Sequence, residues 1–173
     1  MIACAMAVAA HCAQAQTIPP MKTGLWQIHI DSDRDGTKQP DMSERMKNMS
    51  PEARQKMEAA MKERGMDLGD MSRRKVCYTR EMLDRGRWAE QQGVCKTDYS
   101  TRSASSWKWH SSCKQIGYEG DGEATFSNAE NYVVRSTGVI TSGSKTHTTQ
   151  MTITAKWLGS DCGDIKPVEL PKP

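Results

Sequence analysis

The sequence is poor in apolar and aromatic side chains. Hydrophobic residues make up 36% of its 173 residues, and a single Phe accompanies five Trp, four Tyr and twelve Met. We therefore expect a small core whose bulk comes from Trp and Met. No apolar run approaches the roughly 18 residues of a membrane-spanning helix, so none is expected. The net charge of +3, from 24 basic and 21 acidic residues, is too small and too mixed to indicate nucleic-acid binding.

Charged residues are missing from positions 1–15. This alanine-rich segment ends in Ala13-Gln14-Ala15, which has the A-x-A form of a signal-peptide cleavage site. The basic start of a signal peptide is lacking, as it would be if the beginning were truncated. We expect export to the periplasm and a mature chain that begins at Gln16. The alternative is a frayed N-terminal helix.

Four cysteines remain after that cleavage: Cys77, Cys95, Cys113 and Cys162. An even number in an exported chain favours two disulfides. A four-thiolate metal site would usually contain a C-x-x-C knuckle, and the sequence has none. The cysteines therefore indicate disulfides rather than metal.

Alternating side chains predict a hairpin from residues 95–99 and 107–113, turning at 103–105. In this register Cys95 faces Cys113, Tyr99 faces Trp109 and Thr101 faces Trp107. Facing residues lie near the separation that a disulfide requires. We therefore expect the disulfides Cys95–Cys113 and, by elimination, Cys77–Cys162.

The rest of the pattern predicts a mainly β fold. Residues 24–31 alternate with Trp26, Ile28 and Ile30 on one face, which indicates a half-buried strand. A polar loop over 31–40, a strand over 74–78 and a brief helix over 81–91 are expected to follow. After residue 94, β-formers and regularly spaced turns predict an antiparallel meander, including a second hairpin at 142–144.

A helical insertion is expected between the first two strands, over about 41–65. Ser50 suits the N-cap, Pro51 the first helical position and Gly65 the C-terminal stop. The whole is expected to be one β-rich domain over 16–165, a curved sheet or partly closed barrel of roughly six to eight strands. Residues 166–173 form a Pro-rich tail.

Several segments together resemble a known family. The segments are Met21-Lys22-Thr23-Gly24-Leu25-Trp26, Met49-Ser50-Pro51-Glu52, Lys75-Val76-Cys77-Tyr78-Thr79 and Lys156-Trp157-Leu158-Gly159-Ser160-Asp161-Cys162-Gly163. In this order they are similar to the family called domain of unknown function 3617, small exported proteins of Gram-negative bacteria. The resemblance implies export and architecture, and it assigns no catalytic residue.

Two patterns raise the possibility of metal binding. Asp31, Asp33 and Asp35 precede Gly36 as in the first half of a calcium loop, but Met42 stands where the bidentate Glu belongs. We therefore expect no tight calcium site. The second pattern is a stripe of Met46, Met49, Met57 and Met61 along the helical insertion. Thioethers bind Cu(I), but the same spacing buries a helix face, so we expect packing or a partner contact.

No recognisable motif places a Ser or Cys nucleophile beside a base, and the mature cysteines are expected to be paired. We therefore expect a non-catalytic periplasmic module without a cofactor, which binds an envelope protein or a small apolar ligand. The alternative is a metal-binding protein, through Cu(I) at the Met stripe or calcium at the acidic segment.

Overall fold

The computed structural model describes residues 18–38, 48–63, 65–66, 70, 72–84 and 95–167. The elements in these ranges are β1 (Gly24–Arg34), β2 (Thr37–Lys38), α2 (Pro51–Glu63), β3 (Arg73–Tyr78), α3 (Arg80–Asp84), β4 (Lys96–Arg102), β5 (Ser106–Cys113), the 3-10 helix η1 (Lys114–Ile116), β6 (Tyr118–Asn128), β7 (Asn131–Ser142) and β8 (Lys145–Gly159). The expected signal segment 1–15, most of the expected tail, and residues 41–47 and 85–94 lie outside these ranges.

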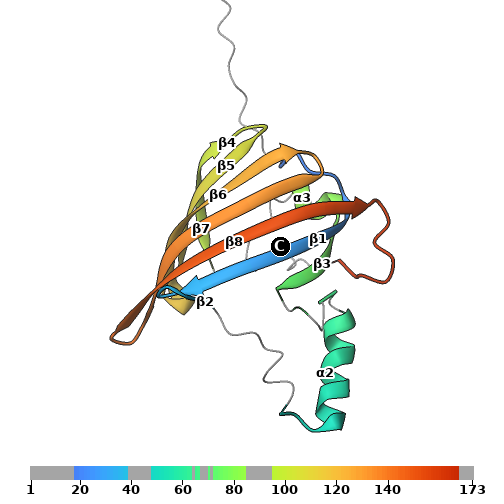
Figure 1. Ribbon diagram of the computed structural model, residues 1–173. Helices are drawn as coiled ribbons and strands as arrows, with labels where there is room; N and C mark the ends of the chain where they lie inside the picture. The colour runs from blue at the N-terminus through green and yellow to red at the C-terminus, as the bar shows by residue number, and fades with distance from the viewer. Residues whose placement is uncertain are drawn as a thin grey trace, which may run out of the picture.

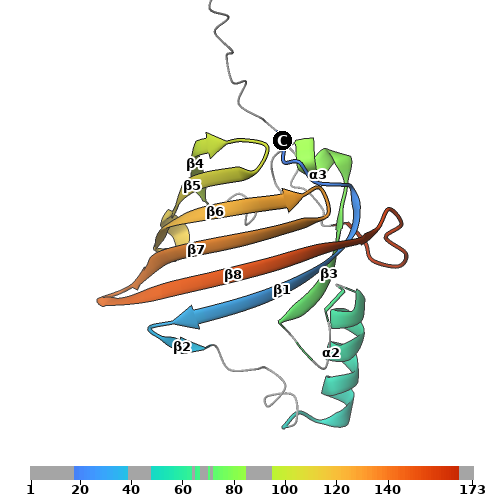
Figure 2. The same cartoon turned by 45° about the horizontal axis from the view of Figure 1, so that its top comes forward.

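All the strands belong to one antiparallel sheet of eight strands. Its order is β2-β1-β8-β7-β6-β5-β4, and β3 pairs with the first half of β1, on the edge that β2 pairs further along. Figures 1 and 2 show a strongly curved, open sheet, with α3 at one end and α2 standing apart beyond β3. The expected mainly β meander is confirmed.

The first strand is longer than the sequence analysis expects. β1 continues through Arg34, and Asp35 and Gly36 form a two-residue turn into β2 with φ angles of 53° and 77°. Two consecutive positive φ angles at Asp-Gly are typical of a type I′ hairpin turn. The prediction of a polar loop over 31–40 is therefore wrong for the residues up to Lys38.

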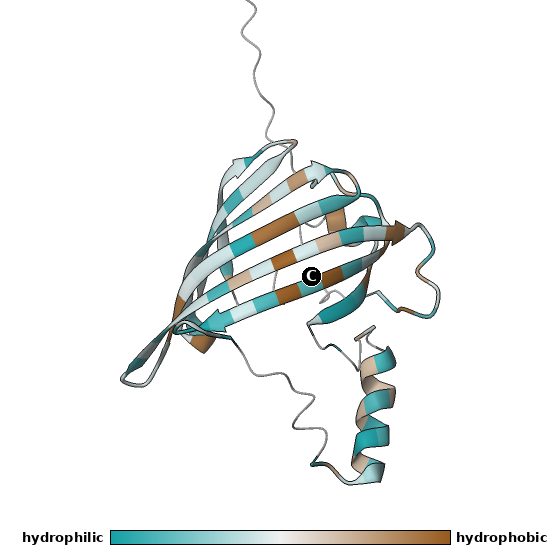
Figure 3. Ribbon diagram, in the orientation of Figure 1, coloured by the Kyte–Doolittle hydropathy of each residue, from teal (hydrophilic) through white to brown (hydrophobic). Residues whose placement is uncertain are grey.

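The core lies on the inner, concave face of the sheet, where apolar residues alternate with outward polar ones (Figure 3). Trp26 and Trp107 are completely buried, and Leu83 of α3 is 1% exposed against them. The other members of this cluster are Ile28, Tyr78, Met82, Ala124, Phe126, Tyr132, Val134 and Ala155. The bulk is aromatic, as expected; of the described Met residues, Met82 belongs to the buried cluster and Met21 packs against it.

The polar atoms of the buried aromatic rings have partners. The indole N–H of Trp26 donates to the carbonyl of Lys22, and that of Trp107 donates to the carbonyl of Ser103. The hydroxyls of Tyr78 and Tyr132 lie 3.0 Å apart, and burial raises the pKa of both phenols. The tyrosines therefore stay neutral and hydrogen-bonded within the core.

The hairpin of β4 and β5 follows the expected register over its first half. Tyr99 pairs with Trp109 as expected, but a bulge follows Tyr99, so that Thr101 pairs with Lys108 and Arg102 with Trp107. The prediction that Thr101 faces Trp107 is therefore wrong. The extra residue of a bulge reverses which side chains beyond it point inward.

Both expected disulfides are present. Cys95 is bonded to Cys113 across the start of this hairpin, and Cys77 of β3 is bonded to Cys162, which follows β8. The second hairpin has Ser142 opposite Lys145, which leaves a two-residue turn. Val134 then faces Ile153 on the inner face.

The two disulfides should stabilise the folded protein by different amounts, because they close loops of different length. The Cys77–Cys162 bond spans 85 positions and the Cys95–Cys113 bond spans 18. Chain entropy gives about 4–5 kcal/mol for the first and about 3 kcal/mol for the second. We expect the Cys77→Ala/Cys162→Ala pair to lose more unfolding free energy in urea than the Cys95→Ala/Cys113→Ala pair.

Peptide mapping of the unreduced protein provides the control, because it should yield these two linked pairs. A peptide joining Cys77 to Cys95 would contradict both the pairing and the hairpin register. An equal loss of stability in the two variants would contradict the loop-entropy account.

Candidate functional site

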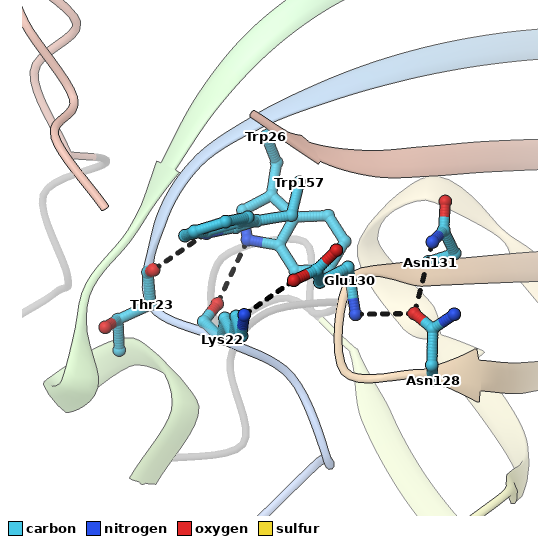
Figure 4. A network of polar contacts seen from close by, with 7 residues as sticks. All are labelled: Lys22, Thr23, Trp26, Asn128, Glu130, Asn131 and Trp157. Atoms are coloured by element: carbon cyan, nitrogen blue, oxygen red, sulfur yellow. Dashed lines mark hydrogen bonds and ion pairs between the residues drawn. The ribbon is translucent and has the colours of Figure 1, made fainter. Parts of the chain in front are cut away.

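A network of polar contacts holds one end of the sheet, and we call it the clasp (Figure 4). Its members are Lys22, Thr23, Asn128, Glu130, Asn131 and Trp157. The ammonium group of Lys22 lies 2.6 Å from the Glu130 carboxylate and 4.4 Å from the centre of the Trp157 ring. The indole N–H of Trp157 donates to the carbonyl of Thr23. The Asn128 side chain accepts hydrogen bonds from the backbone of Glu130 and the amide of Asn131. The clasp thus ties the segment before β1 to the β6–β7 turn and to β8.

The clasp and the strand crossing beside it account for two of the sequence motifs. Gly24 has a φ of 120°, and a side chain there would collide with the backbone of Gly159 and Ser160. Trp26, two residues on, is the centre of the core. The residues of the K-x-G-L-W and K-W-L-G motifs therefore hold β1 against β8, which is a structural role.

The three carboxylates of the acidic segment have separate protein partners. Asp31 lies on the outer face of β1, 3.2 Å from Nε2 of His29. Asp33 accepts a hydrogen bond from the backbone N–H of Gly36. Asp35 accepts hydrogen bonds from the backbone and hydroxyl of Thr148 and lies 2.6 Å from Nδ1 of His147.

Asp35 therefore joins the β1–β2 turn to the start of β8. The hydrogen bond from His147, followed by the one from the Thr148 backbone, lowers the pKa of the Asp35 carboxyl. Within the described ranges, no three His, Cys, Asp or Glu side chains are grouped so that they could hold a metal ion. The expectation of no tight calcium binding stays a prediction.

A second polar network places a serine beside a histidine, which the sequence analysis missed. The Ser72 hydroxyl lies 2.9 Å from Nδ1 of His29, and Nε2 of His29 faces Asp31. Ser72 also donates a hydrogen bond to the Asp70 carboxylate. Ser72 and His29 lie 43 positions apart, and the pairing of β1 with β3 brings them together. No local motif carries such a signal.

This network has the composition of a catalytic triad but a different hydrogen-bond order. The Ser72 hydroxyl donates its hydrogen bond to Asp70, so its oxygen is left to accept a hydrogen bond from the Nδ1–H of His29. A general base must instead accept the hydroxyl proton. The arrangement therefore suits a structural link between β1 and the start of β3.

A hollow of about 620 Å³ lies along β4–β7. Its lining includes the inward-pointing row of Tyr99, Trp109, Gly122 and Ser136, together with the residues that flank this row along each strand. On the outer face the flanking residues form two rows, which are Asp98, His110, Asp121 and Thr137, and Ser100, Lys108, Glu123 and Arg135. Lys108 and Glu123 lie 3.6 Å apart, and Lys96 and Asp98 lie 2.8 Å apart. The mixed and largely paired charges select no single sign of ligand.

His110 is the titratable centre of this face. Its Nδ1 lies 3.0 Å from Asp121 and its Nε2 lies 3.3 Å from Glu119, both on β6. The hydrogen bond to Asp121, supported by that to Glu119, raises the pKa of His110. Asp98 of β4 is its cross-strand neighbour and is itself paired with Lys96. Protonated His110 therefore links β5 to β6 more strongly than neutral His110 does.

The methionines of the expected stripe have different environments. Met61 is 7% exposed, whereas Met57 and Met49 are half-buried. Met46 lies outside the described residues. The C-terminal end of the stripe is thus more deeply buried than its middle.

Taken together, the fold and these networks define an open, curved, single-sheet β domain that is cross-linked by two disulfides. The sequence model of a family described as "Protein of unknown function (DUF3617)" matches residues 21–162. The chain belongs to this family. The match covers every described strand.

A relative in Pseudomonas putida is described as "Uncharacterized protein in lpd-3 5'region". It is 29% identical to this chain over 132 residues, which are 73% of this chain and 89% of the relative. No solved structure matches the chain. In the described part of the chain, no helix has the length and apolar character needed to cross a membrane.

The raised pKa of His110 predicts a pH-dependent stability. The contribution of His110 is fully present below about pH 6.5, the unfolded-state pKa, and is lost as the pH rises through the raised folded-state pKa. We expect the melting temperature of the wild type to fall more between pH 6 and pH 8 than that of His110→Gln. Asp121→Asn, which removes the strongest partner, should behave in between. Identical pH profiles for the wild type and His110→Gln would contradict this role.

The hydrogen-bond order at Ser72 predicts that its hydroxyl is not activated. A fluorophosphonate probe, which labels serine hydrolases, should leave Ser72 unmodified in the folded protein. Intact-mass measurement after incubation checks this, with Ser72→Ala as the background. Labelling that disappears in both Ser72→Ala and His29→Gln would reveal an activated serine and contradict a purely structural role for this network.

Proposed function

We propose that the protein is an exported, non-catalytic binding module that engages a partner protein through helix α2. Its two disulfides fit an extracellular or periplasmic compartment, where oxidation is maintained. The observation that carries the proposal is the position of α2, which stands off the sheet while bearing an apolar stripe.

The isolation of α2 is clear in two views of the molecule. Figures 1 and 2 both show the helix beyond β3, away from the concave face that holds the core. Among the described strands, none makes more than slight contact with α2. The helix has 13 residues, and helices of that length are marginal in water without tertiary contacts.

The helix is nevertheless fixed to the domain at its C-terminal end. The N–H of Gly65 donates to the carbonyl of Lys62 and the N–H of Met66 to that of Met61, which is the Schellman pattern. The N–H of Lys75 in β3 then donates to the carbonyl of Gly65. The N-terminal end is capped by Ser50, whose hydroxyl accepts the N–H of Ala53. α2 is thus a well-ended helix held in one direction.

The accessible part of the stripe is suited to a protein groove. Ala53 and Met57 are half-buried and Ala60 is exposed, and all three lie within one face of the helix. Amphipathic helices commonly dock such a face into an apolar groove of a partner, and Met adapts to irregular grooves. The exposed Glu52, Arg54, Lys56 and Lys62 provide charges of both signs for the rim of the contact.

The alternative function, Cu(I) binding by Met57 and Met61, rests on their spacing of one helical turn. Both functions use the same residues but depend on different properties. A partner contact needs an apolar face of the right volume, whereas Cu(I) needs the sulfur atoms.

A charge placed on the stripe should abolish the partner contact. We expect Met57→Glu to lose a photo-cross-link formed from a probe at position 60 in intact cells. Gln55→Glu adds the same charge to the exposed opposite face and should retain the cross-link. A probe at position 55 should cross-link weakly. Equal cross-linking from positions 55 and 60, or its survival in Met57→Glu, would contradict docking through this face.

The double variant Met57→Leu/Met61→Leu separates the two functions. It conserves volume and should cost less than about 1.5 kcal/mol per site while the cross-link is retained. If Cu(I) binding is the role, this variant should stay folded but fail to bind Cu(I) in a titration against a competing chelator, whereas the wild type should bind it.

A further inference from the structure

The bulge in β4 gives Arg102 an unusual position. Without the bulge, Thr101 would face Trp107 and Arg102 would point to the outer surface. With it, Arg102 pairs with Trp107 and so faces inward with the core residues. Bulges often reorient one side chain close to a functional site. The inward turn of a cation at the rim of an aromatic core therefore requires an explanation.

The guanidinium group is stacked on aromatic rings. Its central carbon lies 3.9 Å from the centre of the Tyr99 ring and 5.2 Å from that of the Trp107 ring. These are cation–π distances, and the flat guanidinium suits them better than an ammonium would. The stacking holds the group in one orientation.

The contacts that the Arg102 guanidinium makes with the described residues are aromatic. Its Nε is buried, and it is the one buried side-chain nitrogen or oxygen in the described residues that lacks a hydrogen bond. Within those residues, Arg102 forms ring contacts only. An unsatisfied buried donor is costly, and in native proteins it often marks the place of an absent acceptor.

The charges of the sheet are segregated in a way that favours an anion on this face. The described strand positions that point inward carry no acidic side chain, whereas Arg34, Arg74, Arg102 and Lys145 are basic. The strand carboxylates lie on the outer face, namely Asp31, Asp33, Asp98, Glu119, Asp121 and Glu123. The inward-pointing side chains of the strands therefore carry net positive charge.

Apolar surface lies beside the cation. In the next row of the sheet, Tyr99, Trp109 and Met151 are half-buried and face inward. The Trp109 ring lies flat on Gly122, where any side chain would collide with it. Because Gly122 has no side chain and Ser136 has a small one, the side chains of this row rise little above the backbone of the sheet. An apolar chain fits along such a row.

We propose that Arg102 anchors the carboxylate of a single-chain anionic amphiphile, whose apolar chain lies on the inner face beside Tyr99 and Trp109. The Arg102 side chain is half-buried, and its guanidinium binds the carboxylate in the forked geometry that Arg provides. The site is independent of α2, so it stands whether or not α2 binds a partner.

The test is a titration of the purified protein with dodecanoate, followed by tryptophan fluorescence and calorimetry. Dodecyl maltoside has the same chain without the charge, and inorganic phosphate has charge without the chain. We expect dodecanoate to bind in the micromolar range and both comparison compounds to bind at least tenfold more weakly. Phosphate that binds as well as dodecanoate would assign the site to small anions and overturn the proposal.

Variants locate the site. Arg102→Met keeps the apolar stem and should weaken dodecanoate binding tenfold or more, whereas Arg102→Lys keeps the charge and should weaken it by a smaller factor. Arg135→Met, on the outer face, is the matched control and should bind as the wild type does. If Arg102→Met does not fold by circular dichroism, a loss of at least threefold in Arg102→Lys decides the question. Wild-type affinity in the folded Arg102 variants, or no binding of dodecanoate to the wild type, would overturn the proposal.

Discussion

The pairing of β1 with β8 is the constraint on which the rest of the structure depends. β4 to β8 follow one another as a meander, so each of their pairings is local in sequence. β1 must instead find a strand more than a hundred positions away, from Leu25 opposite Gly159 to Arg34 opposite Thr149. Such a contact carries a large loop-closure cost, which only strong local interactions can offset.

Those local interactions surround the crossing of the two strands. Trp26 is completely buried, the clasp of Lys22, Glu130 and Trp157 closes over it, and the Cys77–Cys162 disulfide links β3 to the residues after β8. β3, β1 and β8 are therefore fixed as a unit. Because α2 is attached to β3, the direction of α2 is set by the same unit.

The predictions from sequence succeeded where the determining information is local. Alternation predicted the inner faces of β1 and β5, and single residues marked the ends of α2. The Asp35-Gly36 turn was also marked in the sequence, but the polar residues around it predicted a loop rather than a hairpin. The bulge after Tyr99 has no comparable sequence marker. The meeting of Ser72 with His29 depends on the β1–β3 pairing, which sequence patterns leave open.

The irregularity of β4 has a further consequence at the border of the sheet. β4 is the last strand in the sheet order, and its outer backbone groups resemble a template for another chain. A regular ladder there would invite edge-to-edge aggregation. The bulge interrupts that ladder, and Lys96 and Asp98 add charge along it. The same distortion that turns Arg102 inward thus also makes this edge a poorer template for another strand.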